Sequence, residues 1–404
     1  MKKALMYGAG NIGRGFIGQL FSLSGYEVTF IDINEAVVSQ LQTERSYPLY
    51  ITRGEEYEKQ EVKNVTGLLG KDPEVVGDMI AKADVMATAV GVNVLPYIAK
   101  PIACGVKHRF AEGNKTPLNI IICENKLGAD SFLRSLINEH LSDEEKAYFA
   151  EYFGLVEASI GRMVPATPEE IRKENPLSVC VEEYCQLPVD KAAFKGEIPQ
   201  IVNLMPFEPF EFFIQRKLFM HNMSHALTAY LGALCGCEYI WQAALNPSIK
   251  LLALQALLES SQALSKEHGV DIKELIDHSE DLLYRFENKL LGDTSLRVGR
   301  DTIRKLSKHD RLIGAHNLCK KHGISPVYIC LGIAAALHFS PDDDSASQEI
   351  AESAKTVGIA ATLEKYSELT DKQSVELIEL LYKKLSEKAE MQEIITLLEI
   401  EKRK

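Results

Sequence analysis

The sequence predicts an α/β fold in two domains, a parallel sheet covered by helices followed by a mainly α-helical domain. Its 404 residues exceed the usual size of a single domain. Up to about residue 125, short apolar runs alternate with helical stretches, which is typical of a parallel sheet. Beyond about Pro206, helical spacing replaces this alternation. We therefore expect domains at residues 1–200 and 201–404.

The expected elements of the first domain begin as strand, helix, strand and helix. They are strands at Lys3–Tyr7, Glu27–Asp32, Asp84–Val90 and Leu118–Cys123, and helices at Ile12–Leu23 and Asn34–Gln42. The last two strands are nearly continuous apolar runs, as expected for strands covered on both faces. Alternating apolar and polar residues within Gly154–Leu187 predict an extension of the sheet.

Helical spacing and length predict the elements of the second domain. They are Phe207–Leu234, Ile249–His268, Asp271–Leu290, Val327–His338 and the segments after Ser345. Three aspartates directly before Ser345 indicate a helix start, because acidic groups are stabilised near the positive end of the helix dipole.

The composition excludes several classes of protein. A net charge of -12 argues against general binding to nucleic acid or anionic membranes, since both require a basic surface. The start MKKALMYGAG leaves no room for a signal peptide, so we expect a cytoplasmic location. The eight cysteines show no metal-ligand spacing and are expected to be small buried residues. For the two cysteines of Cys235-Gly236-Cys237, the alternative interpretation is a redox-active pair.

A glycine-rich turn connects the first expected strand to the first helix. Its residues are Gly8, Ala9, Gly10, Asn11, Ile12 and Gly13, which fit G-x-G-x-x-G. In such a turn the first glycine allows a tight bend, the second lets backbone approach a pyrophosphate, and the third allows close helix packing. The helix N-terminus then offers N–H groups to the phosphates. This context predicts a Rossmann-type dinucleotide site.

Asp32 ends the second expected strand, 19 residues after Gly13. A carboxylate at about this spacing binds the hydroxyl groups of the adenosine ribose and repels a 2′-phosphate, so it favours NAD over NADP. The alternative is a structural glycine turn with Asp32 as an ordinary loop residue. A dinucleotide site alone fits a dehydrogenase, an isomerase or a redox sensor.

Lys217, Asn222 and His225 bring polar chemistry to the otherwise apolar helix Phe207–Leu234. With α-helical geometry, Asn222 lies about 140° and His225 about 80° around the axis from Lys217. Alcohol oxidation with NAD needs a base, and burial near a cationic nicotinamide lowers the pKa of a lysine toward neutrality. Amide N–H groups stabilise the developing oxyanion, and a histidine can orient the reacting oxygen. The alternative to a catalytic site is that Lys217 and Asn222 are ordinary surface residues and His225 is a histidine of the core.

The segment 297–311 carries six basic and two acidic residues, a local charge of 6 - 2 = +4 against -16 for the rest of the chain. Arg297, Arg300 and Arg304 are spaced for one helical face, and Arg311 follows. Guanidinium groups suit a phosphate monoester. The alternative is a salt-bridged surface helix.

Several motifs together resemble the polyol-specific long-chain dehydrogenases, in particular the mannitol-1-phosphate 5-dehydrogenases. They are GAGNIGRGFIG at 8–18, K-x-x-x-x-N-x-x-H at 217–225, HALTAYLG at 225–232, and RFEN and RVGRDTIRKLSKHDRL within 285–312. The resemblance implies a Rossmann domain, a helical domain and NAD-dependent interconversion of D-mannitol 1-phosphate and D-fructose 6-phosphate without a metal ion.

The resemblance also implies roles for individual residues. Lys217 corresponds to the general base, Asn125 and Asn222 to an oxyanion hole, and His225 to a contact with the substrate oxygen. With the resemblance, some of Arg297, Arg300, Arg304 and Arg311 become expected phosphate ligands.

The chain departs from the family pattern near the expected substrate site. Gly161 replaces an acid in Ile160-Gly161-Arg162, Met223-Ser224 replaces the usual Thr-Gly, and His221 precedes Asn222. These departures leave open a free polyol or a hexuronate as substrate. A catalytically silent NAD-binding regulator is the alternative from another class, although its expected signature, loss of the lysine or histidine, is absent.

Overall fold

The computed structural model describes residues 1–126 and 128–403. Two compact units divide the chain, Met1–Phe213 and Ile214–Lys404. The first is an α/β unit and the second is helical, which confirms the expected fold class. The expected domain limits at residues 200 and 201 stay a prediction.

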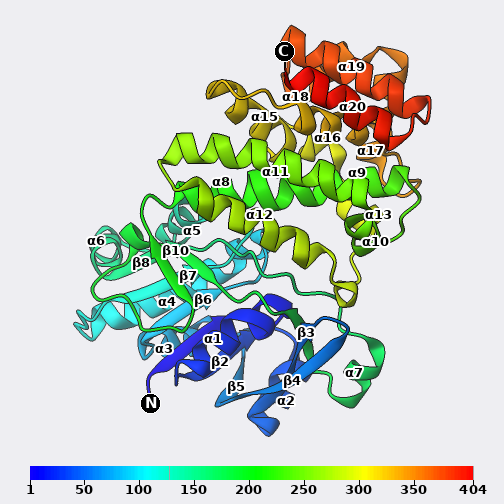
Figure 1. Ribbon diagram of the computed structural model, residues 1–404. Coiled ribbons are helices and arrows are strands. Elements are labelled where there is room, and N and C mark those ends of the chain that lie inside the picture. The colour runs from blue at the N-terminus through cyan, green and yellow to red at the C-terminus, as the bar shows by residue number, and fades with distance from the viewer. Residues whose placement is uncertain (127, 404) are drawn as a thin grey trace. The chain divides into compact units, whose positions relative to one another are not determined.

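The central feature of the first unit is a six-stranded parallel sheet with the order β5-β2-β1-β6-β7-β8 (Figure 1). Its strands are β1 (Lys3–Tyr7), β2 (Glu27–Asp32), β5 (Val65–Leu69), β6 (Val85–Thr88), β7 (Leu118–Ile122) and β8 (Phe153–Glu157). This is the 3-2-1-4-5-6 order of dinucleotide-binding folds, in which ligands bind beyond the carboxyl ends of the strands. The predicted strands are confirmed, and β8 provides the extension expected after Gly154.

Helices cover both faces of this sheet. They are η1 (Gly13–Ile17), α1 (Gly18–Leu23), α2 (Glu35–Glu44), α3 (Pro73–Ala81), α4 (Leu95–Ala111), α5 (Ala129–Asn138) and α6 (Asp143–Tyr152). The unit also contains the short helices η2 (Val92–Val94), α7 (Glu169–Glu174) and η3 (Lys191–Ala193). Side chains alternate along β1, so Ala4 and Met6 pack with η1 and α1 while Leu5 and Tyr7 pack with α3 and α4. Each face of the sheet therefore has its own hydrophobic core.

Two smaller sheets complete the first unit. Their strands are β3 (Ser46–Arg53), β4 (Glu56–Lys63) and β9 (Val179–Glu182) in one sheet, and β10 (Leu187–Asp190) and β11 (Leu204–Phe207) in the other. The alternation around Val179 was correctly interpreted as a strand, but β9 pairs with β3 instead of extending the central sheet. Phe207 ends β11, so the helix predicted from Phe207 begins later, at Glu211.

The second unit consists of helices packed on one another. They are the end of α8 (Glu211–Arg216), η4 (Lys217–Asn222), α9 (Met223–Leu234), α10 (Ile240–Leu245), α11 (Pro247–His268), α12 (Ile272–Phe286), η5 (Lys289–Leu291), α13 (Ser295–Gly299), α14 (Thr302–Lys305), α15 (Arg311–Lys321), α16 (Val327–Ala336), α17 (Ser345–Thr356), α18 (Ile359–Ser367), α19 (Lys372–Ser386) and α20 (Met391–Lys402). Asp344 caps α17 by accepting a hydrogen bond from the Ser347 N–H group, which confirms the predicted helix start.

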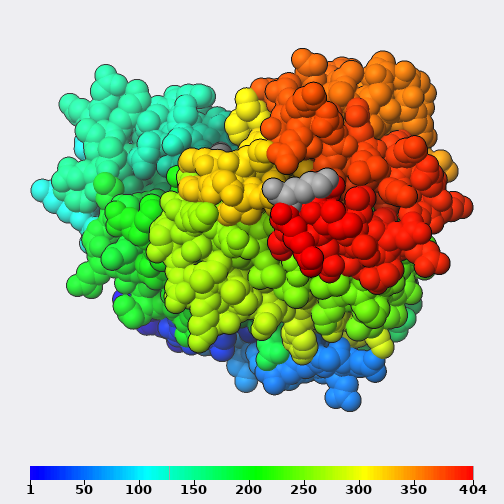
Figure 2. Space-filling model, turned by 45° about the horizontal axis from the view of Figure 1, so that its top comes forward, coloured from blue at the N-terminus to red at the C-terminus, as the bar shows by residue number. Residues whose placement is uncertain are grey.

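The centre of the helical unit is α16, which is buried along its whole length. The helices α9, α11, α15 and α19 pack against it, and the C-terminal helices lie together at the surface in Figure 2. Within residues 1–126 and 128–403, no helix combines the length and apolarity that crossing a membrane requires. All eight cysteines are free thiols, but Cys235 is exposed, against the expectation that the cysteines are buried.

Candidate active site

The glycine-rich turn follows β1 and has the backbone that its residue types predict. Gly8 has φ of 103°, a conformation that residues with a Cβ rarely adopt. A Cβ on Gly13 would collide with the carbonyl oxygen of Gly8, which explains the close packing of helix and turn. A Cβ on Gly10 would meet no atom within 4 Å. The turn therefore leaves open space at the glycine that is expected to face a pyrophosphate.

Asp32 lies at the carboxyl end of β2, beside this turn. Its Oδ2 accepts a hydrogen bond from the Ala9 N–H group at 2.7 Å, and its Oδ1 accepts one from Asn34 N–H at 2.9 Å. The carboxylate is thus held at the edge of the turn, where an adenosine ribose is expected. Asn11 and Ile12 continue the turn into the helix. The structure brings all the predicted cofactor residues together in the first unit.

Arg14 supports the turn from inside the protein, although it was not among the predicted site residues. Its buried guanidinium group donates from Nε to the Ala9 carbonyl at 2.7 Å and from Nη1 to the Leu177 carbonyl at 2.5 Å. Burial lowers the pKa of Arg14, while Tyr47 and Asp32 oppose this shift. The position of this charged residue inside a glycine-rich motif is a signal that could have identified it, but its partner Leu177 is distant in sequence.

Asn125 lies on the loop after β7, at the same carboxyl edge of the sheet. The preceding residue, Glu124, is buried and accepts hydrogen bonds from the backbone of the turn after β6. Asn125 itself is exposed. It belongs to the first unit, whereas the other predicted catalytic residues belong to the second.

Lys217 and Asn222 mark the two ends of a π-helical turn, η4, within the continuous helix from Glu211 to Leu234. Backbone hydrogen bonds of a π turn join residues five apart, and such turns are frequent at functional sites. Lys217 and Asn222 therefore come round to nearly the same side of the axis. The angle of about 140° expected from α-helical geometry is wrong, because the sequence does not reveal the extra residue in this turn.

The environment of Lys217 favours its neutral amine. Burial lowers the pKa of Lys217 from 10.5 to about 8, and the guanidinium group of Arg311 adds to this shift. A lysine with this pKa can accept a proton near neutral pH, which an ordinary lysine does poorly. The surroundings of Lys217 within the helical unit thus agree with the prediction of a desolvated lysine.

His225 lies one helical turn beyond Asn222, against an aromatic ring. Its imidazole stacks on Phe286 with ring centroids 4.8 Å apart and an interplanar angle of 16°. Its Nε2 is 3.5 Å from Oδ2 of Asp293. Burial, with Arg297 next, lowers the pKa of His225 to about 3, so burial outweighs the contact with the carboxylate. The imidazole is therefore neutral at physiological pH and can both donate and accept a hydrogen bond.

The predicted helical face of arginines is wrong. Arg297 belongs to α13, which ends at Gly299, so Arg300 lies just beyond it, and Asp301 adopts φ of 63° before α14 begins. Arg304 then lies on α14 and Arg311 starts α15. The backbone between these short helices breaks the common face that a continuous helix would give.

Each of the four arginines has an acidic partner. The pairs are Arg297 with Asp293, Arg300 with Asp343, Arg304 with Asp301 and Asp310, and Arg311 with Asp310 at 2.7 Å. The side chains of Arg297, Arg300 and Arg304 are 64%, 46% and 49% exposed, against 13% for Arg311. Arg311 is the one whose charge acts on both Lys217 and His225. The structure thus groups Arg311 with Lys217 and His225.

Lys305 joins this group, although it was counted only as part of the basic segment. It is 5% exposed, and burial together with Arg311 and Arg304 lowers its pKa to about 8. Its ammonium also acts on His225. Lysine is almost never so deeply buried without a reason. The sequence signal was weak, because Lys305 lies in a run of exposed basic residues.

The structure shows the neighbours of two residues that depart from the family pattern, Gly161 and His221. A Cβ on Gly161 would come 3.3 Å from the ring of Tyr184, so that ring occupies the space beside the missing acid. His221 is buried, and its ring is 5.9 Å from that of Phe286 and 6.0 Å from that of His225. Burial, then Arg285, lowers the pKa of His221 well below its usual value.

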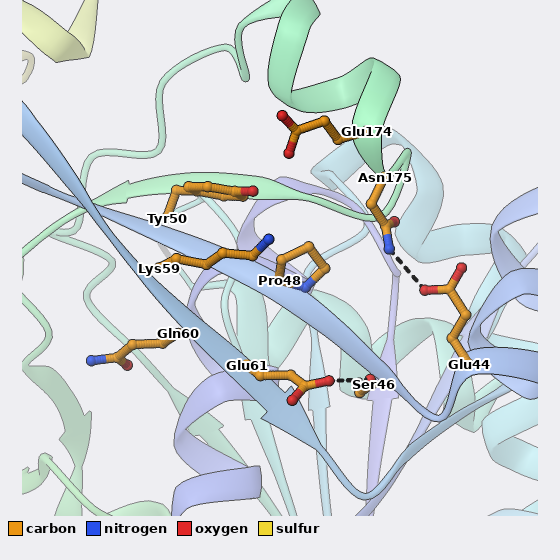
Figure 3. A pocket seen from close by; sticks show the side chains of 9 residues that line it. All are labelled: Glu44, Ser46, Pro48, Tyr50, Lys59, Gln60, Glu61, Glu174 and Asn175. Atoms are coloured by element: carbon orange, nitrogen blue, oxygen red, sulfur yellow. Dashed lines mark hydrogen bonds between the residues drawn. The ribbon is translucent and has the colours of Figure 1, made fainter.

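A separate cavity of about 620 Å³ lies over β3 and β4 (Figure 3). Its lining includes none of the predicted site residues, all of which the structure describes. Its polar groups bind one another: Ser46 donates to Glu61 at 2.7 Å and Asn175 to Glu44 at 2.8 Å (Figure 3). We therefore do not place the active site there.

Comparison with known proteins agrees with both units. The family model of the mannitol dehydrogenase Rossmann domain matches residues 2–203, and that of the mannitol dehydrogenase C-terminal domain matches residues 209–399. The first match confirms the dinucleotide-binding domain that the glycine turn predicts.

Two solved structures share the fold over nearly the whole chain. A D-sorbitol dehydrogenase in substrate-free form is 15% identical, with a TM-score of 0.78 and coverage of 96% of this chain and 94% of that one. A Pseudomonas fluorescens mannitol 2-dehydrogenase, in a ternary complex with NAD and D-mannitol, is 14% identical, with a TM-score of 0.73 and coverage of 100% and 94%. At these identities the likeness concerns the fold, and the family models carry the assignment. The chain belongs to the mannitol dehydrogenase family.

Proposed function

We propose that this protein is an NAD-dependent oxidoreductase that interconverts D-mannitol 1-phosphate and D-fructose 6-phosphate. The cofactor is NAD, held by the glycine turn and the carboxylate of Asp32. Family membership supports a polyol as the reduced substrate. The observation that carries the proposal is the π turn, which aligns Asn222 with a lysine whose pKa is lowered to about 8.

NAD, when bound, supplies the acceptor for the hydride that leaves the carbinol carbon. The neutral amine of Lys217 takes the hydroxyl proton as the carbonyl forms, and returns it in the reverse reaction. The amide groups of Asn222 and Asn125 donate hydrogen bonds to the oxygen as its negative charge develops. His225, held neutral and stacked on Phe286, orients the same oxygen. The proton transfers need no metal ion.

The cationic groups around Lys217 support a phosphorylated substrate. The charges of Arg304, Lys305 and Arg311 outnumber those of Asp301 and Asp310 in this part of the helical unit. A phosphate monoester carries nearly two negative charges at pH 7 and would offset the excess. Arg311 and Lys305 are better placed for this role than the exposed Arg297, Arg300 and Arg304, which remain the other members of the proposed set.

A hexuronate is the second candidate substrate, because its carboxylate would satisfy the same cations. Gly161, which lacks the family acid, removes a carboxylate that would repel either anion. A free polyol gains nothing from the buried charge of Lys305. A silent regulator has no use for a lysine with a lowered pKa, which makes it the weakest alternative.

The test is the rate of NADH oxidation with fructose 6-phosphate, fructose, fructuronate and tagaturonate, each with and without a chelator. We expect kcat/KM for fructose 6-phosphate to exceed that for fructose by at least about 100-fold, the worth of two charge-assisted hydrogen bonds. The chelator should leave the rate unchanged. If fructuronate or tagaturonate is turned over in preference, the substrate is a hexuronate and not a sugar phosphate. Tight NADH binding without turnover of any compound would overturn the enzymatic proposal.

A further inference from the structure

Glu124 joins the carboxyl ends of two neighbouring strands of the central sheet. It follows β7, it is 7% exposed, and its two oxygens bind different residues of the turn after β6. Oε1 accepts a hydrogen bond from the Val90 N–H group at 2.9 Å, and Oε2 accepts one from Gly91 N–H at 2.8 Å. One side chain thus holds both backbone donors of this turn.

The turn at Val90 and Gly91 borders the glycine-rich turn. The Ala89 N–H group donates to the Tyr7 carbonyl at 2.9 Å, and a Cβ on Gly8 would collide with the Ala89 carbonyl oxygen. β1 and β6 flank the point where the strand order reverses, and dinucleotides bind at that point in open α/β sheets. The turn that Glu124 holds is therefore a wall of the cofactor crevice.

Glu124 also immediately precedes Asn125, the proposed oxyanion donor on the same loop. The backbone before it is fixed to β6, because the Cys123 N–H group donates to the Thr88 carbonyl at 2.9 Å. The Cys123 backbone and both carboxylate oxygens of Glu124 are thus bound, and they fix the point from which the chain continues to the exposed Asn125. A carboxylate suits this task better than an amide, because both of its oxygens are acceptors.

We propose that Glu124 is a positioning residue that couples the cofactor crevice to the oxyanion donor. Its carboxylate holds the wall turn at Val90 and Gly91 on one side and Asn125 on the other, so both are set by one group. The part concerning Asn125 rests on the proposed function. The part concerning the cofactor rests on the turn and the sheet order alone.

Glu157 provides a matched control on the next strand. It ends β8, and its Oε1 accepts a hydrogen bond from the Ala129 N–H group at 2.6 Å, at the start of α5. It is thus another carboxylate that binds backbone at the carboxyl edge, but its partner is Ala129, whereas the Val90 and Gly91 N–H groups donate to Glu124. Glu157→Gln should affect stability without altering the crevice.

The experiment compares Glu124→Gln, Glu124→Ala and Glu157→Gln with the parent chain. NADH affinity is measured by fluorescence titration, which needs no turnover, and kcat is measured with the best substrate of the panel. We expect Glu124→Ala to weaken NADH binding about tenfold and to lower kcat by about 10- to 100-fold, because small displacements of reacting groups are costly. Glu124→Gln keeps one acceptor oxygen, so its NADH affinity and kcat should lie between those of the parent and of Glu124→Ala. Glu157→Gln should change NADH affinity less than twofold.

A double-mutant cycle with Asn125→Ala separates positioning from general destabilisation. If Glu124 acts through Asn125, the factor by which Glu124→Gln lowers kcat should be at least fivefold smaller in the Asn125→Ala variant than in the parent chain. Additive losses of kcat, or unchanged NADH affinity in both Glu124 variants, would overturn the coupling. If Glu124→Ala does not fold, the Glu124→Gln variant and the double-mutant cycle test the positioning role instead. Absence of turnover with every substrate would reject the proposed function and with it the Asn125 half, while the NADH titrations still decide the cofactor half.

Discussion

Lys217 combines two properties at the scale of a single residue. It lies on the side of the helix that Asn222 also occupies, and burial brings its pKa to about 8. The charge of Arg311 contributes in the same direction, so the group that lowers the pKa of the base is also a proposed ligand of the substrate anion. The two roles are therefore linked, and changes to Arg311 should alter both the affinity and the pH dependence of the reaction.

The first prediction concerns the base itself. Lys217→Ala should lower kcat by about 10²- to 10⁴-fold, the usual contribution of a general base, while NADH affinity stays within about twofold. Steady-state kinetics and fluorescence titration measure the two quantities. The control is Lys308→Ala, because Lys308 forms an exposed ion pair with Glu368 at 2.7 Å. Activity of the Lys217 variant within a few-fold of the parent would remove this lysine from its role.

The second prediction is the pH profile. Polyol oxidation requires the neutral amine, so its kcat/KM should rise with pH and level off above about 8. Ketose reduction requires the protonated amine and should instead decline above about pH 8. His225, with a pKa of about 3, should add no inflection between pH 5 and 9. Profiles measured in both directions test this, and the same sign of slope in both would contradict the assignment.

At the scale of the element, the π turn determines which residues can cooperate. The helices α8 and α9 on either side of η4 are out of phase by one residue relative to a continuous α-helix. The sequence predicted the helix from its spacing but not this extra residue, because a π turn is recognised by its backbone hydrogen bonds, which the residue types do not reveal. The predicted angle between Lys217 and Asn222 was therefore wrong, while their catalytic roles stay a prediction.

The third prediction changes the phase of the helix between these two residues. Inserting one alanine after Leu218 should rotate Lys217 by about 100° relative to Asn222. We expect kcat to fall at least as far as in Lys217→Ala, with NADH affinity unchanged because the glycine turn belongs to the other unit. Circular dichroism establishes that the helical unit remains folded. Retained activity would show that the alignment of these two residues is unnecessary.

Other elements show where sequence patterns succeed and fail. The strands β1 and β2 match their predicted ranges because short runs rich in apolar residues, with a glycine nearby, leave little ambiguity. The arginine face failed because the spacing of charges carries no information about the break at Arg300 and Asp301. Glu124 and Lys305 were missed as site residues because their importance comes from burial, which depends on residues distant in sequence.

At the scale of the whole molecule, stability and pH are coupled through a buried acid outside the site. Glu259 on α11 is 1% exposed and accepts backbone hydrogen bonds from Tyr328 and Ile329 at the start of α16, at 3.0 and 3.1 Å. Burial raises its pKa from 4.5 to about 8. Because the folded-state pKa is raised, its contribution to stability is greatest below about pH 4.5 and is lost as pH rises through about 8.

The fourth prediction follows from this sign. Glu259→Gln should make the decline in Tm between pH 5 and 9 smaller by roughly 10 °C, because a pKa raised from 4.5 to about 8 is worth about 4 kcal/mol over this range and each kcal/mol shifts Tm by about 2–4 °C in a domain of this size. Thermal unfolding at both pH values, followed by circular dichroism, measures the difference. Glu267→Gln is the control, because Glu267 pairs with Lys321 near the surface and its pKa is lowered. An unchanged pH dependence in Glu259→Gln would exclude this coupling.

The lowered pKa of Lys217 also gives the protein an unusual chemical reactivity. At pH 8 about half of such amines are neutral, whereas an ordinary lysine with a pKa near 10.4 is neutral in less than about 1% of molecules. Electrophiles that acylate or alkylate free amines therefore encounter one lysine that is roughly a hundred times more often nucleophilic than those on the surface. Lys305 has the same pKa but is almost completely buried. A compact amine-directed reagent would consequently label Lys217 first, at the residue on which the proposed catalysis depends.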